Sequence, residues 1–166
     1  KAPTMAISDG IGTRVYIGAA LNEANRTPSA YVSLTWTEIG GVETVSEFGD
    51  DGAVISHTPL ATGRTRQRKG AVNPGNVTFG CADGPLDAGQ ILAIAAAATT
   101  RLYPIKVVAA DGADSNDTDS VVYFGARILS AKVNRGSSSA VNMRNIVCAI
   151  DTTNYEVPSA VVSGGS

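Results

Sequence analysis

The chain has 166 residues, of which 43% are hydrophobic and 17% charged, with 18 glycines and a net charge of −2. This length allows one domain with its own hydrophobic core, so no disulfide framework or metal is needed to hold it together. The near-neutral charge argues against a protein that grips nucleic acid, because such affinity grows with the number of Lys and Arg side chains that meet phosphates. Low charge and many glycines fit a self-associating chain better than a monomer with a solvated surface.

The chain shows no pattern for export or for a membrane. Lys1–Met5 is not followed by a continuous apolar segment, so we expect no secretion signal and assembly in the cytoplasm of the producing cell. The longest apolar run, Ile91–Ala98, is far shorter than the roughly 20 residues that cross a bilayer, so we expect no membrane segment.

Alternation of apolar and polar residues predicts four strands in the first half of the chain, at 13–18, 31–38, 53–58 and 76–82. In the second strand, alternate residues from Val32 to Trp36 share one face, which places Trp36 in the core. In the fourth, Val77, Phe79 and Cys81 share one face.

A helix follows, with Asp83 as its N-cap, Pro85 in its first turn and Leu86 to about Thr99 as its body. Its expected sheet-packing stripe consists of Ala88, Ile91, Leu92 and Ala95. Three more strands are predicted at 103–110, 121–133 and 140–150. The middle one is apolar on both faces, with Tyr123, Leu129 and Val133 opposing Val122, Phe124 and Ile128, so we expect it to be covered on both sides.

Many short strands with one helix predict a mainly β fold, a β-sandwich or curved barrel with one flanking α-helix. We expect a single domain at 1–150 that includes an N-terminal arm at about 1–12, followed by a C-terminal arm or flexible tail at 151–166. The least structured internal segments are expected at 40–52 and 111–120.

The run from Thr35 to Ala71 joins a Trp-bearing strand, a Gly40-Gly41 break, an acidic Glu-Phe-Gly-Asp turn, a further strand and alternating arginines that end in Lys-Gly-Ala. The pattern continues through Asp83–Gln90 and Tyr103–Val107. In this order and spacing, the chain resembles the tail tube proteins of long-tailed bacteriophages.

The resemblance implies a structural virion protein, not an enzyme, that uses no cofactor. Six copies would close a ring by joining their sheets around a lumen, and stacked rings would form the hollow tail tube through which the genome leaves the capsid. It implies contacts with further copies, a tail tip or baseplate initiator, a tape measure protein and a tail terminator, while DNA passes without specific binding. The alternative from another class is a monomeric β-sandwich binding or adhesin module, whose aromatic platform would need Trp36 and the tyrosines.

Two charged segments are the expected contact sites between subunits or rings. They comprise Glu47, Phe48, Asp50, Asp51, Arg64, Arg66, Arg68 and Lys69. The three arginines alternate and so project to one side, opposite Lys69. They could be a charged strand edge, could pair with acidic residues at 47–51 or 111–119 of a neighbour, or could bind DNA. We expect Phe48 to be exposed in the monomer and buried between subunits.

No motif for catalysis or for a bound metal stands out. His57 is the only histidine, Gly10-x-Gly12 lacks the third glycine of a dinucleotide fingerprint, and no phosphate loop is present. Acidic and amide side chains cluster in one loop, but without the glycine and glutamate of a calcium loop they indicate a solvated turn: Asp111, Asp114, Asn116, Asp117 and Asp119. Cys81 and Cys148 are expected to be buried free thiols.

Overall fold

The computed structural model describes residues 10–21, 27–112 and 118–158. Within these ranges the chain forms ten strands and two helices. In chain order they are β1 (Arg14–Gly18), α1 (Pro28–Val32), β2 (Trp36–Ile39), β3 (Val42–Val45), β4 (Asp51–His57), β5 (Arg66–Asn73), β6 (Asn76–Ala82), α2 (Ala88–Ala97), β7 (Tyr103–Val108), β8 (Val121–Asn134), β9 (Met143–Ile150) and β10 (Tyr155–Val157).

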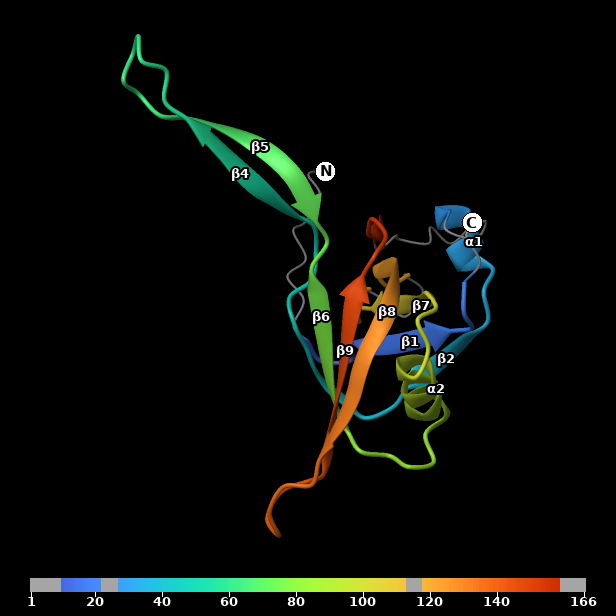
Figure 1. Ribbon diagram of the computed structural model, residues 1–166. Helices are drawn as coiled ribbons and strands as arrows, with labels where there is room; N and C mark the ends of the chain where they lie inside the picture. Colours follow the sequence, from blue (N-terminus) through green and yellow to red (C-terminus); the bar gives the residue numbers. More distant parts are fainter. Residues whose placement is uncertain (1–9, 22–26, 113–117, 159–166) are drawn as a thin grey trace.

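Eight of the strands form one antiparallel sheet in the order β2-β1-β7-β8-β9-β6-β3, with β10 also paired to β8. The long strand β8 joins the two halves, because residues 121–126 pair with β7 and residues 126–134 pair with β9. The sheet therefore curls on itself without closing, and β1 and β2 run across the direction of β6, β8 and β9 (Figure 1). The prediction of a mainly β, sandwich-like subunit with a flanking helix is confirmed.

The main core lies inside this curl. Val15 and Ile17 of β1 face Val77, Phe79 and Cys81 of β6, and all five side chains are fully buried. The alternation predicted for 13–18 and 76–82 is therefore confirmed. The first half of β8 is covered on both faces, because Phe124 packs in the main core and Tyr123 in a second cluster on the opposite face.

Helix α2 begins one turn later than predicted. Its N-cap is Asp87, whose carboxylate accepts hydrogen bonds from the backbone N–H groups of Gly89 and Gln90 at 3.0 and 3.4 Å. Asp83, the predicted cap, instead accepts a hydrogen bond from Arg144 of β9 at 3.0 Å. Leu86 lies outside the helix and is 93% exposed.

The predicted packing stripe of α2 was wrong for Ala88, Ile91 and Ala95, which are exposed, and is confirmed for Leu92, which packs against the main core. The helix buries Gly89, Gln90, Ala93 and Ala96, while Ile91 is 50% exposed. A Cβ atom on Gly89 would collide with the backbone carbonyl of Glu38, so only a glycine allows the helix to approach β2 this closely. Residue size, rather than hydrophobicity alone, decides which face packs.

Of the strand predicted at 31–38, only Trp36–Glu38 is confirmed, as part of β2. The short helix α1, which begins at Pro28, takes Tyr31 and Val32 instead. Val32 is 63% exposed, whereas Tyr31 is buried and stacks on Tyr123 with 6.1 Å between ring centroids. Trp36 is half-buried in this second cluster, not in the main core, and its ring lies 5.9 Å from that of Tyr123.

Two segments expected to lack structure contain short strands. The 40–52 segment holds β3 and the start of β4, and the segment after Asp151 holds β10, where Tyr155 pairs with Tyr123. These strands were missed because three or four residues carry too little alternation to detect. No helix among the described residues is long and apolar enough to span a membrane.

Candidate assembly surfaces

The half-sheet β3–β6–β9–β8 has two open edges. Among the described strands, β3 pairs only with β6, and β8 beyond Ala126 pairs only with β9. Unpaired backbone N–H and C=O groups along such edges are ready to pair with another strand. Apolar side chains accompany them on β8, where Leu129 is 56% and Val133 is 41% exposed.

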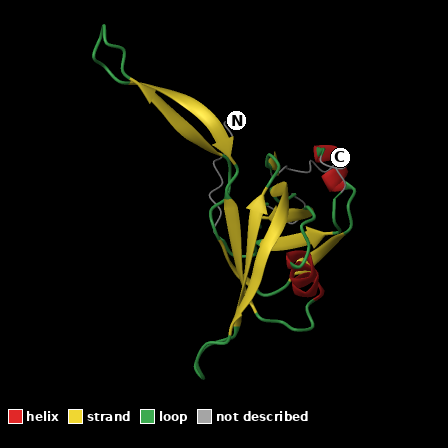
Figure 2. Cartoon of the chain, viewed as in Figure 1, coloured by secondary structure: helices red, strands yellow, loops and turns green. Residues whose placement is uncertain are grey.

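The second surface is the hairpin formed by β4 and β5, which projects away from the body of the molecule (Figure 2). Every residue from Ala53 to Lys69 except Pro59 is exposed. An isolated two-stranded hairpin is marginally stable in water. A partner that packs against the hairpin would therefore stabilise it.

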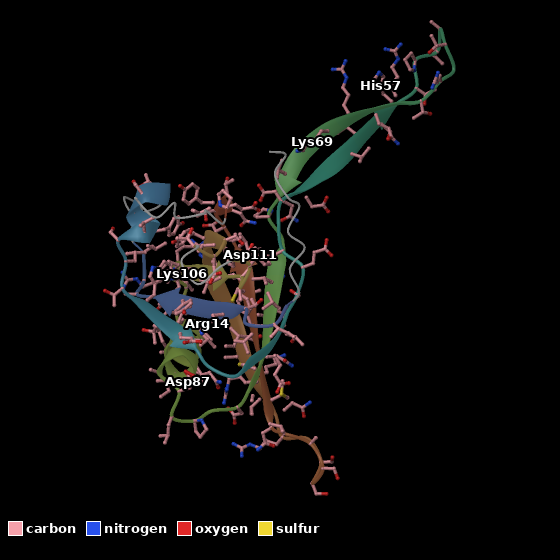
Figure 3. All side chains as sticks on the ribbon, turned by 180° about the vertical axis from the view of Figure 1, so that it is seen from behind. Arg14, His57, Lys69, Asp87, Lys106 and Asp111 are labelled. Atoms are coloured by element: carbon pink, nitrogen blue, oxygen red, sulfur yellow. The ribbon has the colours of Figure 1, made fainter. Side chains whose placement is uncertain are left out.

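Cross-strand register fixes which hairpin side chains share a face. Ile55 lies opposite Arg68 and His57 opposite Arg66, so one face carries both arginines and the histidine. Val54 lies opposite Lys69 on the other face. The predicted separation of the arginines from Lys69 is thus confirmed for Arg66 and Arg68. Arg64 lies in the turn before β5 and is not part of the strand. Figure 3 shows His57 and Lys69 on the projecting hairpin.

The hairpin and the rest of the chain have net charges of opposite sign. Residues 51–73 contain four of the 13 Lys and Arg residues and one of the 15 Asp and Glu residues, so this segment carries a net charge of +3 and the rest of the chain −5. Within the part of the chain that the structure describes, none of the hairpin arginines forms an ion pair. The single acidic residue of this segment, Asp51, cannot balance four cations, so most of their counter-charge must come from outside the hairpin.

The acidic segment at 47–51 lies at the base of the hairpin. Glu47 and Phe48 line two adjoining open hollows of about 490 and 550 Å³, and Asp50 and Asp51 line the second of them. The expectation that Phe48 is exposed in the monomer was wrong. Its side chain is half-buried and packs on Phe124 of the main core, with 5.5 Å between ring centroids.

The loop after β7 uses its carboxylates to hold its own backbone. Asp111 accepts hydrogen bonds from the N–H and hydroxyl of Ser120 at 2.7 and 2.6 Å, and these bonds lower the pKa of Asp111. Asp119 accepts a hydrogen bond from the N–H of Gly112 at 2.9 Å. The other members of this predicted cluster, at 114, 116 and 117, lie outside the described residues. Among those described, no group of three metal-binding side chains occurs.

The two cysteines are free and buried, as predicted. Cys148 lies opposite Val77 in the sheet and Cys81 opposite Arg144, so register keeps the thiols apart. Burial raises the pKa of Cys81 to about 11 and that of Cys148 to about 12, which leaves both thiols protonated and unreactive near neutral pH.

The aromatic side chains do not form an open platform. Trp36 packs on Tyr123, and the ammonium of Lys106 lies 4.4 Å from the ring centroid of Tyr16 and 5.2 Å from that of Trp36. Burial among these rings lowers the pKa of Lys106. Figure 3 shows Lys106 and Arg14 near each other on the body of the molecule, away from the projecting hairpin. The rings of Trp36, Tyr123 and Tyr155 thus pack on one another, and Tyr155 remains 37% exposed.

No protein-family model and no curated protein sequence matches the chain. Solved structures do match it. The SPP1 tail tube superposes with a TM-score of 0.63 at 14% identity, over 90% of this chain and 78% of that chain. This chain has the fold of a tail tube subunit. Two chains from injection systems also superpose on this chain.

The first of these comes from the anti-feeding prophage baseplate, with a TM-score of 0.58 at 10% identity over 95% of this chain and 97% of that chain. The second comes from the sheath/tube terminator structure of an extracellular contractile injection system, PVC. It has a TM-score of 0.58 at 12% identity, over 95% of this chain and 98% of that chain. All three matched structures are components of tails or injection systems.

Proposed function

We propose that this protein is the structural subunit of a phage tail tube and polymerises as stacked hexameric rings around a channel for the genome. The observation that carries this proposal is the open-edged half-sheet β3–β6–β9–β8 within a fold similar to that of the SPP1 tail tube. The protein is assembled in the host cytoplasm and resides in the tail of the virion.

Ring closure follows from the two open edges. The edge of β8 in one copy pairs with the edge of β3 in the next, which satisfies the backbone groups that a single subunit leaves unpaired. Such a contact joins two different surfaces, so repeating it around an axis produces a ring rather than a dimer. The apolar side chains of Leu129 and Val133 leave water when this contact forms.

The hairpin supplies a second contact between copies. The cationic hairpin face with Arg66 and Arg68 pairs with the acidic segment of a neighbour, where Glu47 and Asp50 are exposed or lie at the rim of a hollow. Charge complementarity of this kind fixes register and orientation between subunits. The remaining partners are the tail tip or baseplate initiator, the tape measure protein and the tail terminator.

Substitution of Leu129 tests the edge contact. Leu129→Lys places a charge on the open edge, a feature that blocks strand pairing, and the residue is exposed enough for the monomer to tolerate it. Val32→Lys is the matched control, because Val32 is 63% exposed on α1, away from both edges. We expect Leu129→Lys to remain monomeric and Val32→Lys to form tubes, as judged by electron microscopy. Tubes formed equally well by both variants would contradict the edge contact.

A further inference from the structure

The half-sheet β3–β6–β9–β8 has one face in the core and one face open. Val77, Phe79, Ile146 and Cys148 point into the core and are fully buried. In Figure 1, β6, β9 and β8 lie in front and β1 crosses behind them, so no described helix or strand covers the opposite face. We call this opposite surface, formed by the side chains of these four strands that point away from the core, the open face.

Sheet register orders the open face into rows across the strands. These are Arg127, Ala149 and Asn76; Ser130, Val147 and Thr78; Lys132, Asn145, Gly80 and Thr44; and Asn134, Met143 and Ala82. Most of these side chains are small or uncharged. No carboxylate occurs in any of these rows.

The rows of the open face contain two cations, Arg127 and Lys132, of which only Arg127 has an ion-pair partner among the described residues. Arg127 forms an exposed ion pair with Asp151, to which it donates a hydrogen bond at 2.6 Å. Lys132 is exposed, and no ion pair forms between it and another described residue. Its cross-strand neighbour is Asn145, whose amide adds hydrogen-bonding capacity beside the ammonium.

The geometry of a closed ring decides where this face points. When copies join edge to edge through β8 and β3, one face of the joined sheet lines the channel. The core side carries the crossing half-sheet and α2, and this bulk fits only outside the closed sheet, where the circumference is larger. The open face therefore lines the channel, an inference that rests on the proposed function.

We propose that Lys132 is a phosphate contact, a weak and non-specific one, for duplex DNA in the channel. Each ring places one such ammonium per copy at one height, in a cross-strand row that contains no carboxylate to repel the DNA backbone. One cation per subunit keeps each contact weak, so the DNA remains free to slide. Contacts with two phosphates make affinity fall about tenfold when salt rises from 50 to 200 mM.

Assembled tubes provide the test. A short fluorescent duplex is incubated with tubes, DNA bound outside is removed with nuclease, and the protected duplex that sediments with the tubes is measured at 50 and 200 mM salt. Lys132→Gln removes the charge and Lys132→Arg retains it. Arg101→Gln removes one exposed cation outside the open face and is the matched control.

We expect protected duplex in wild-type, Lys132→Arg and Arg101→Gln tubes, with about a tenfold decrease at the higher salt, and a loss of most protected duplex in Lys132→Gln tubes. The proposal is overturned if Lys132→Gln tubes protect as much duplex as wild type, if wild-type tubes protect none, or if Lys132→Gln fails to assemble and so places Lys132 between copies. Failure of the wild-type protein to form tubes would instead contradict the proposed function.

Discussion

Replacing the buried glutamine of α2 should destabilise the subunit strongly. Gln90 is 1% exposed, and its side-chain amide makes three hydrogen bonds to backbone groups. Nε2 donates to the carbonyls of Gly40 and Ala82 at 3.0 and 2.8 Å, and Oε1 accepts from the N–H of Gly84 at 3.0 Å. The side chain thereby ties the turn between β2 and β3 to the segment between β6 and α2.

The variant Gln90→Leu fills the same space but leaves three backbone groups without these partners. At about 1 kcal/mol for each lost hydrogen bond, the free energy of unfolding should fall by about 3 kcal/mol. For a chain of this length, that loss lowers the melting temperature by about 6–12 °C. Thermal and urea unfolding of the monomer measure both quantities. A loss below about 1 kcal/mol would refute the role of this network.

The companion variant Gln90→Glu adds a pH dependence. An ionised carboxylate at this buried site cannot donate to the Gly40 and Ala82 carbonyls, so the folded-state pKa of the new group should rise above its unfolded value of about 4.3. A raised folded pKa gives stability that is present at low pH and lost as pH rises. The loss of unfolding free energy relative to wild type should therefore be larger at pH 7 than at pH 4. Equal losses at the two pH values would contradict a buried site that requires a hydrogen-bond donor at residue 90.

Three further predictions concern the core and the hairpin. Phe48→Ala should lower monomer stability by about 2 kcal/mol, half the cost for a fully buried ring, and an unchanged melting temperature would place the ring outside the core. Cys81 and Cys148 should resist a thiol reagent at pH 8 until the protein is denatured, because their raised pKa values keep the thiolate scarce, and rapid labelling of native protein would oppose this. Arg66→Glu should block tube assembly and Glu47→Arg should partly restore it, whereas normal assembly of Arg66→Glu alone would remove the hairpin contact.

Strands with one buried face could be predicted from the sequence, because the alternation of apolar and polar residues is enough to indicate which side chains are buried. Val77, Phe79 and Cys81 are the clearest case. The helix face could not be predicted, since its packing depends on how closely the backbone of α2 approaches β2 at Gly89. The pattern of hydrophobic residues in the sequence carries no information on how closely the two backbones approach each other.

The open face could not be predicted either, because a bulge in β8 changes the alternation. Between Ile128 and Ser130 the register shifts by one residue, so Val133 lies on the same side as Ile128 rather than opposite to it. Lys132 consequently points away from the core. The alternation of the hairpin arginines, in contrast, was predictable, because Arg66 and Arg68 lie in an uninterrupted strand segment.

Electron microscopy of the purified protein, alone and with tail tip components, tests the central claim most directly. We expect stacked rings with a central channel, since both edges of the half-sheet are satisfied only when copies join. Featureless monomers at millimolar concentration, even in the presence of tail tip components, would contradict it.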